Sequence, residues 1–361
     1  MSICHSNNKY SGTIFILLMY SIFTINTYSG DGTYAGKNRF SKTRNVNLNI
    51  EQLQDNNLKI GLALSGGAAQ GLAHIGVIKA LEEAGIQIDY ISGSSMGALI
   101  GAAYASGIPI DTLEKIAVNT DWKTVAKLLI PGFSTSGLVD GKRVKEFLGS
   151  IYSDTRIEDC PIPFAATAAD ISTGKLYTIN RGSLLEAVRA SISIPVVCTP
   201  VKYQDILLVD GGLVDPVPIV VKEMGADYII AVHVLHGRLP GEKGEYIQVE
   251  NPEPESLTTW KSTSEWITKQ IKTVNNRGNE HRRDSTNAIN HSKNPGLVSI
   301  SENTIYIAQD VIAQHQIELY KPDLVIEPDT RNINLYEFYR GEDAIEIGYK
   351  EAIKVLEKTQ K

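Results

Sequence analysis

A serine lies between two glycines at the end of an apolar stretch of the chain. Residues 93–97 read Gly-Ser-Ser-Met-Gly; they follow the apolar run 86–91 and precede a run of small residues. Gly-x-Ser-x-Gly between a strand and a helix is typical of a nucleophile elbow, a turn so sharp that the serine points out of the backbone. Glycine is needed on both sides because a side chain there would clash with the neighbouring strand or helix. The pattern predicts Ser95 as the nucleophile of a hydrolase, with Gly93 and Gly97 forming the elbow.

The pentapeptide alone also fits a second interpretation, a glycine-rich turn between a strand and a helix that has no chemical role. Glycine and serine are common residues, so a short motif is only a hypothesis until its context supports it. A serine nucleophile needs a base that accepts its proton and donors that hold the oxyanion of the tetrahedral intermediate. The rest of the chain has to supply both.

A second glycine-rich stretch precedes the pentapeptide. Residues 66–71 read Gly-Gly-Ala-Ala-Gln-Gly and lie between the apolar run 58–65 and a segment of helical spacing, 74–85. N–H groups at a helix N-terminus point outward, and the helix dipole there favours negative charge. The loop is therefore predicted to supply the oxyanion donors, from Gly66, Gly67, Ala68, Ala69, Gln70 and Gly71.

The same loop has the outline of a dinucleotide-binding turn, Gly-x-Gly-x-x-Gly. Gly66 and Gly71 have the required separation, but Ala68 occupies the middle glycine position. Asp89 falls near the place of the acidic residue that binds the ribose. A nucleotide-dependent oxidoreductase remains an alternative, although it does not account for the serine motif that follows. A Walker loop is excluded because no Gly-Lys-Ser/Thr follows.

Histidine is the usual base for a serine nucleophile, but none of the seven histidines has a clear context. His74 lies within the first predicted helix and is expected to pack or cap, and His233 ends an apolar strand and is expected to be a buried, hydrogen-bonded imidazole. Asp210 ends a strand directly before two glycines. A carboxylate within about 2.6–3.2 Å of the serine can act as the base. By its local sequence alone, however, Asp210 fits an ordinary Asp-Gly turn residue better than a catalytic base.

Composition restricts the class of protein. The chain has 361 residues, of which 42% are hydrophobic, and a formal net charge of -6. It is long enough for one large α/β domain or two smaller ones, and its negative charge argues against a nucleic-acid-binding protein. Cys4, Cys160 and Cys198 lack Cys-x-x-Cys spacing, and the histidines do not cluster, so no structural zinc site is expected. Cys160 and Cys198 either pair in an oxidising compartment or remain free thiols.

The first 57 residues are predicted to be a targeting segment and a linker. Lys9 precedes an apolar stretch of eleven residues, 13–23, which has the length of a signal-peptide core and is short for a membrane span. No Ala-x-Ala cleavage site follows, so residues 1–29 are either a signal peptide or an uncleaved N-terminal anchor. Both predict an exported protein: periplasmic, secreted or anchored in a membrane. Residues 30–57 are polar and predict a linker, and 58–361 the globular domain.

The remaining apolar runs predict an α/β fold. Strands are expected at 58–65, 86–91, 164–170, 206–212, 228–234 and 324–328, with a final amphipathic helix at about 344–358. The order of strand, helix and strand at the start predicts parallel strands. A polar insertion at about 236–294 interrupts the domain. A helix within it, 257–274, either contacts a membrane surface or, as is more common, packs on its own domain.

Together, the glycine loop, the serine pentapeptide and the Asp210-Gly211-Gly212 turn resemble the patatin-like phospholipase family. The segments 190–195, 213–218 and 225–227 agree as well. The stretch 322–352 is similar to the bacterial members of the family related to neuropathy target esterase. The resemblance covers about 58–234 and this C-terminal stretch.

The resemblance implies a three-layer α/β/α sandwich with a mainly parallel central sheet, and a Ser–Asp dyad without histidine. Ser95 would attack an ester carbonyl, Asp210 would accept its proton as general base, and the loop 66–71 would bind the oxyanion. No metal and no cofactor would be needed. The expected reaction is hydrolysis of an acyl ester through an acyl-enzyme, with a phospholipid or lysophospholipid substrate at a membrane surface.

One residue departs from the family pattern. Gln70 occupies a position where the family usually has Arg or Lys. Loss of that cation would weaken the positive field on an oxyanion or a lipid phosphate, although the backbone donors would remain. Gln70 therefore also suggests an alternative of another class, a lipid-binding module that has kept the fold and lost turnover.

Overall fold

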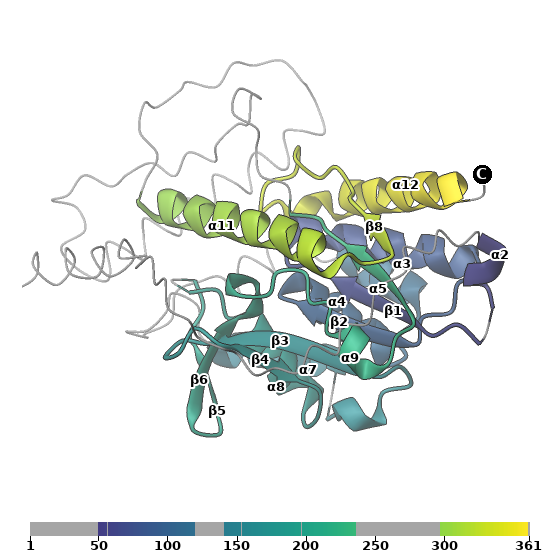
Figure 1. Cartoon of the computed structure of the whole chain (residues 1–361). Helices are drawn as coiled ribbons and strands as arrows, with labels where there is room; N and C mark the ends of the chain where they lie inside the picture. Colours follow the sequence, from purple (N-terminus) through teal and green to yellow (C-terminus); the bar gives the residue numbers. More distant parts are fainter. Residues whose placement is uncertain are drawn as a thin grey trace, which may run out of the picture. The chain divides into compact units, whose positions relative to one another are not determined.

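The computed structural model describes residues 50–55, 57–119, 141–152, 154–195, 197–235 and 297–359 (Figure 1). The predictions for the targeting segment 1–29, the polar insertion 236–294 and the helix 257–274 lie outside the described residues, as does most of the linker 30–57. Over the described ranges, no helix combines the length and the apolar character needed to cross a membrane.

The strands of the described chain form one eight-stranded sheet, in which β4 pairs with β3 and the other strands follow the order β5-β6-β3-β2-β1-β7-β8. The parallel strands are β1 (Ile60–Leu64), β2 (Tyr90–Ser94), β3 (Phe164–Asp170), β7 (Tyr228–Val232) and β8 (Leu324–Ile326). The antiparallel strands are β4 (Leu176–Ile179), β5 (Val201–Tyr203) and β6 (Ile206–Asp210). The prediction of a mainly parallel sheet is confirmed.

Helices cover both faces of this sheet. Neighbouring residues of a strand point to opposite faces, and Leu62 and Ala63 of β1 accordingly belong to two different hydrophobic cores. The core of Leu62 contains residues of α2 (Ile50–Leu53), α3 (Ala73–Glu83), α4 (Met96–Ala105), α5 (Ile110–Asn119), α7 (Gly141–Tyr152), α8 (Leu184–Ser191) and α12 (Gly341–Thr359). The core of Ala63 contains residues of α9 (Val221–Met224) and α11 (Leu297–Tyr320). The predicted three-layer α/β/α sandwich is confirmed.

Four short 3₁₀ turns complete the described elements: η1 (Ala68–Leu72), η2 (Ile157–Asp159), η3 (Gly211–Leu213) and η4 (Phe338–Arg340). Two of them directly follow the strands of greatest interest. η1 comes after β1 and contains most of the predicted oxyanion loop, and η3 comes after β6 and begins next to Asp210.

Strand β2 begins later than the apolar run 86–91 predicts. Pairing with β1 starts at Tyr90, opposite Gly61, and continues to Gly93, opposite Leu64. Asp89, the residue before Tyr90, bonds Ile60 of β1 in two ways: its backbone N–H donates to the Ile60 carbonyl at 2.8 Å, and its carboxylate accepts the N–H of Ile60 at 2.9 Å. The strand therefore extends into the serine pentapeptide and ends at Ser94.

The two edges of β3 are occupied differently. Strand β4 pairs with residues 166–169, while β2 pairs with 164–167 and β6 with 168–170. Each β-residue has one neighbouring strand on each side, so β2 and β6 share the edge opposite β4. Ser94 lies opposite Thr167, and Asp210 lies opposite Ala168. The C-terminal ends of β2 and β6 therefore meet beside β3, which places Ser95 next to Asp210.

Candidate active site

Ser95 occupies a strained backbone conformation directly before helix α4. Its φ is 51° and its ψ is -119°, a region that serine rarely adopts and that recurs at active sites. A Cβ added to Gly93 would collide with the Gly97 carbonyl, and one added to Gly97 would collide with the Leu64 carbonyl. These close approaches require glycine on both sides of the turn.

Asp210 is buried at the end of β6, with 1% of its surface exposed. Its Oδ1 accepts the N–H of Gly212 at 2.8 Å. Within the described part of the chain, Oδ2 has no partner with hydrogen-bond geometry. Burial raises the pKa of Asp210 to about 6, and hydrogen bonding from the Ser95 hydroxyl and the Gly212 N–H opposes this rise. The Ser95 hydroxyl therefore interacts with the carboxyl, and bonds of this kind often tighten only when substrate binds.

Four of the six N–H groups of the loop 66–71 already donate within the protein. The acceptors are the carbonyls of Pro216 for Gly66 (3.1 Å), Leu335 for Ala69 (3.0 Å), and Gly67 for both Gln70 (3.0 Å) and Gly71 (3.3 Å). The N–H groups of Gly67 and Ala68 have no backbone acceptor among the residues that the structure describes. Both residues line a small cavity together with Ser95 and Asp210. Of the six N–H groups predicted as oxyanion donors, those of Gly67 and Ala68 are therefore the two candidates that remain.

The side chain of Gln70 bonds to segments away from Ser95. Its Nε2 donates to the carbonyl of Ile333 at 2.8 Å, and its Oε1 accepts the hydroxyl of Tyr306 on α11. Gln70 is buried and is not among the residues that line the cavity shared by Ser95 and Asp210. Residue 70 therefore ties the glycine loop to two later segments, and in this chain it directs no side chain at the serine.

The two histidines with an expected role are buried and lie outside the cavities at Ser95. His74 Nε2 lies 2.8 Å from the Ser65 carbonyl, and burial lowers the pKa of His74 to about 4, so its imidazole is neutral at pH 7. His233 Nε2 lies 3.2 Å from Asp310 Oδ1. Both match the packed, hydrogen-bonded imidazoles that the sequence predicts, and neither is placed to act on Ser95.

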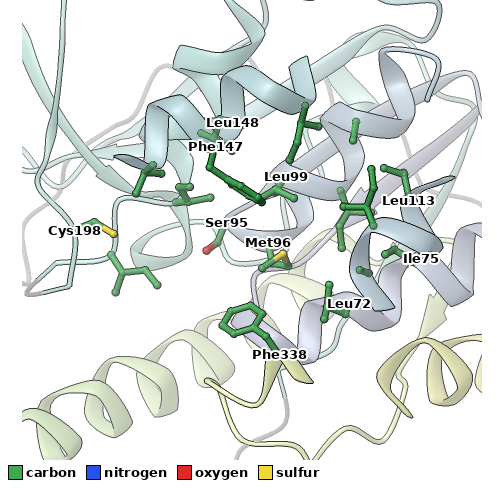
Figure 2. A pocket seen from close by; sticks show the side chains of 18 residues that line it. Leu72, Ile75, Ser95, Met96, Leu99, Leu113, Phe147, Leu148, Cys198 and Phe338 are labelled. Carbon is green, nitrogen blue, oxygen red and sulfur yellow. The ribbon is translucent and has the colours of Figure 1, made fainter. Parts of the chain in front are cut away.

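Ser95 lines a second, larger cavity that is almost wholly apolar. Its volume is about 220 Å³, compared with about 50 Å³ for the cavity shared with Asp210. Figure 2 shows Ser95 between Cys198 on one side and Ile75 and Leu113 on the other. A cavity of about 150 Å³ with such a lining holds benzene, so this one has room for part of an acyl chain.

The walls of the larger cavity come from elements far apart in the sequence, which is why its lining could not be predicted. Met96 and Leu99 come from α4, Phe147 from α7 and Phe338 from η4. The segment before Phe338 closes the smaller cavity through Leu335 and Tyr336. Residues 333–338 therefore border both cavities and also accept two hydrogen bonds from the glycine loop.

No group of three or more His, Cys, Asp or Glu side chains in the described ranges is arranged to hold a metal ion. Cys160 and Cys198 are free thiols. Burial raises the pKa of Cys198, so this residue contributes a neutral, apolar thiol to the cavity wall.

The chain matches the model of the family described as Patatin-like phospholipase over residues 62–221, which include Ser95 and Asp210. An uncharacterized NTE family protein of Mycobacterium tuberculosis is 32% identical over 339 residues, covering 83% of this chain and 91% of that protein. Lysophospholipase nte1 of Emericella nidulans is 34% identical over 182 residues, covering 48% of this chain and 12% of that protein. The solved structure of VipD from Legionella pneumophila aligns with a TM-score of 0.41 and 12% identity over 83% of this chain and 67% of that chain.

The chain belongs to the patatin-like phospholipase family, as its motifs predict. Its similarity to the mycobacterial protein extends well beyond the matched family region. Membership and the lysophospholipase relatives support a lipid hydrolase and give no support to a nucleotide-dependent oxidoreductase. Asp89, the residue in the ribose-binding position of that alternative, instead bonds Lys59 Nζ at 2.8 Å and the N–H of Ile60.

Proposed function

We propose that this protein is a serine acyl hydrolase that cleaves lipid acyl esters with Ser95 as nucleophile and Asp210 as general base. The observation that carries the proposal is the position of Ser95, which lines both a large apolar cavity and a small one that contains Asp210. A lipid ester has the same two parts, an apolar chain and a polar carbonyl with its alcohol. With the chain in the larger cavity, the carbonyl carbon would lie at Ser95.

In the proposed reaction, ionised Asp210 accepts the hydroxyl proton of Ser95 as the serine oxygen attacks the carbonyl carbon. The N–H groups of Gly67 and Ala68 donate to the oxyanion that forms. When the intermediate collapses, the proton passes from Asp210 to the departing alcohol, and the acyl group remains on Ser95. Water then attacks the acyl-enzyme, Asp210 takes the water proton, and the proton returns to the Ser95 oxygen as the fatty acid leaves.

The burial of Asp210 supports its role as a base. A carboxylate with an ordinary pKa accepts protons weakly at pH 7, whereas burial raises the pKa of Asp210 to about 6. The carboxyl is then still mainly ionised at neutral pH and is a stronger base, which is the balance that general base catalysis needs. The N-terminus of α4, which starts at Met96, adds a positive dipole end beside the serine oxygen.

We further propose a lipid with one acyl chain, a lysophospholipid, as the preferred substrate. Of the two cavities that Ser95 lines, one has about 220 Å³ of apolar space and the other about 50 Å³. A lipid with one acyl chain would place that chain in the larger cavity and its small polar part in the smaller one. Over the part of the chain that the structure describes, a second acyl chain would have no comparable apolar cavity at Ser95. The fungal relative is named as a lysophospholipase, which is in line with this choice.

A lipid-binding module without turnover is the alternative, and it was suggested by Gln70. The bonds of the Gln70 side chain to Ile333 and Tyr306 weaken that suggestion, because this side chain does not point to Ser95. The base, the strained serine and two available N–H donors support catalysis instead.

The test combines an active-site label with a panel of lipids. We expect a fluorophosphonate to label Ser95 in the wild type, and we expect lysophospholipid to be hydrolysed faster than diacyl phospholipid. Folded wild-type protein that binds lipid without labelling or hydrolysis would establish the binding module instead.

We also propose that the protein is exported and works at a membrane surface. The apolar stretch 13–23 supports this proposal, and it lies outside the described residues. Fractionation of cells that express the full chain, compared with a chain in which Leu17 and Leu18 are replaced by Asp, tests it. Recovery of both proteins in the cytosol would contradict export.

A further inference from the structure

One short segment contacts both residues of the proposed dyad. Ser191, the last residue of α8, accepts the N–H of Ser95 at its Oγ, at a distance of 2.9 Å. The carbonyl of Ser193 accepts the N–H of Asp210 at 3.0 Å. Ser191 and Ser193 are both fully buried. The placement of Ser95 relative to Asp210 therefore depends on the conformation of residues 191–193.

The side chain of Arg189 holds this segment at two points. Its Nη1 donates to Ser193 Oγ at 2.6 Å, and its Nη2 donates to the carbonyl and the Oγ1 of Thr199, each at 3.0 Å. Ser193 Oγ donates in turn to the carbonyl of Arg189 at 2.7 Å. Because a guanidinium is planar and its donors have fixed directions, these bonds set the separation of Ser193 and Thr199.

Arg189 is almost completely buried, with 4% of its surface exposed. Burying a charged group is costly unless it is hydrogen-bonded. If this position served only to fill apolar space, an aliphatic residue would do so at lower cost, so the hydrogen bonds of Arg189 are its distinguishing contribution. The chain between the two points that Arg189 holds includes Ile194, which lines both cavities at Ser95. Arg189 thus also fixes a wall of the substrate site without lining it.

We infer that Arg189 is a positioning residue: its guanidinium holds the segment 191–199 so that Ser191 fixes Ser95 and Ser193 fixes Asp210. The inference rests on the proposed function, because it concerns the same two residues. Arg189 contacts no reacting atom in this role. It acts through the two serines that bond the backbone of the dyad.

The variants Arg189→Lys and Ser193→Ala test the role. Lysine keeps the positive charge but lacks the planar set of donors, and alanine removes one of the two points that Arg189 holds. Val188→Ala is the matched control, since Val188 is the buried neighbour of Arg189 in α8 and is not among the residues lining either cavity. We expect kcat for lysophospholipid to fall about 10- to 100-fold in the two test variants, with KM changed little, because small misplacements of reacting groups have effects of this size. The control should keep its kcat.

A second readout separates positioning from a general loss of stability. Hydrogen bonding from Ser95 lowers the pKa of Asp210, so displacement of the serine should move the acid limb of the kcat profile to higher pH. That shift is expected in Arg189→Lys and Ser193→Ala and not in Val188→Ala. If thermal stability falls in all three variants while kcat and the acid limb remain unchanged, Arg189 is structural only and the inference is wrong.

Amide hydrogen exchange tests the inference independently of catalysis. Peptides that contain the N–H groups of Ser95 and Asp210 should exchange faster in Arg189→Lys than in the control. If the wild type proves inactive and Arg189→Lys still exchanges faster at these amides, the positioning role is preserved and only the proposed function is refuted. Unchanged exchange at both amides would overturn the positioning role. Should Arg189→Lys not fold, Thr199→Val removes a single acceptor and is expected to show the same pattern with smaller changes.

Discussion

Ser95 and Asp210 meet because the residues that end their strands lie opposite neighbouring positions of β3. Ser94 pairs with Thr167, and Asp210 pairs with Ala168. One strand therefore sets the distance between two residues that are far apart in the sequence. A substitution that moves β6 relative to β3 should therefore change catalysis even when Ser95 and Asp210 themselves are unchanged.

Gly211→Ala should disturb this arrangement. A Cβ at Gly211 would collide with the carbonyl of Thr167, so β6 would have to shift from β3. We expect a loss of about 1–3 kcal/mol in the free energy of unfolding, as is typical of overpacking, together with a lower kcat. Urea unfolding and lipid hydrolysis measure the two effects. Gly149→Ala in α7 is the control: among the described residues the added Cβ would meet only Leu185, at 3.6 Å, so the change should be neutral or slightly stabilising. Equal effects at both positions would contradict the prediction.

Removing either side chain of the proposed dyad should abolish hydrolysis. Ser95→Ala lacks the nucleophile and Asp210→Asn lacks the base, so each should lower kcat by about 10⁴-fold or more. Steady-state hydrolysis of a lysophospholipid measures the loss, and circular dichroism checks the fold. Normal activity of folded Asp210→Asn would eliminate the dyad, and another base would then have to be found.

The burial of Asp210 predicts a pH-dependent activity. The base must be ionised, and burial raises its pKa from 3.8 to about 6. In the free enzyme, kcat/KM should therefore fall tenfold for each pH unit below about 6 and be level above it. Burial raises the pKa of the Cys198 thiol, which therefore stays protonated over this range. A profile that is flat down to pH 4.5 would show that Asp210 is not the titrating base.

The raised pKa of Asp210 also predicts that ionised Asp210 lowers the free energy of unfolding, whereas protonated Asp210 does not. The folded-state pKa lies above the unfolded-state value of 3.8, so stability from protonated Asp210 is present below pH 3.8 and is lost as pH rises through 6. A shift of this size corresponds to about 3 kcal/mol. Asp210→Asn should therefore raise the unfolding temperature relative to wild type at pH 8 and have little effect at pH 4. A decrease at pH 8 would contradict this sign.

Ala103→Phe should restrict the length of the acyl chain. Ala103 lines the apolar cavity and lies eight residues beyond Ser95 on α4, which is about 12 Å along the helix axis. A phenyl ring there should lower kcat/KM for long-chain esters at least tenfold, while short-chain esters serve as the internal control. If Cys198→Phe shortens the accepted chain and Ala103→Phe does not, the chain lies on the opposite side of Ser95.

Gln70→Lys tests whether the cation usual in the family would improve this protein. The present side chain is buried and bonds Ile333 and Tyr306. Lysine cannot accept the tyrosine hydroxyl, so we expect a loss of about 1–3 kcal/mol and no gain in kcat. A faster enzyme with unchanged unfolding would show that residue 70 influences the oxyanion by its charge.

The motifs that could be predicted from the sequence are those built from neighbouring residues. The elbow glycines and the Asp210 turn are local, and the strand at 164–170 is predicted with its observed ends because five of its seven residues are apolar. The meeting of β2 and β6 beside β3 could not be predicted, because the sequence of one strand does not specify which distant strand it pairs with.

Helix α11 shows a different limit. Its buried face includes the polar residues Gln309 and Asp310, and Asp310 bonds His233, so the helix has no continuous apolar stripe to recognise. The oxyanion loop shows a third limit. Six residues have suitable N–H groups, and only the carbonyls of Pro216 and Leu335, both distant in sequence, determine which of those groups are already occupied.

The carbonyls of Ile333 and Leu335 hold the glycine loop, and the segment that contains them follows Ser95 by more than 200 residues. A fragment that ended with the matched family region at residue 221 would contain Ser95 and Asp210 but would lack these acceptors. During synthesis, the nascent chain therefore carries its reactive serine long before the ribosome has added the residues that complete the pocket. Such a delay would keep the emerging polypeptide inert toward lipid until the segment 333–338 has been added.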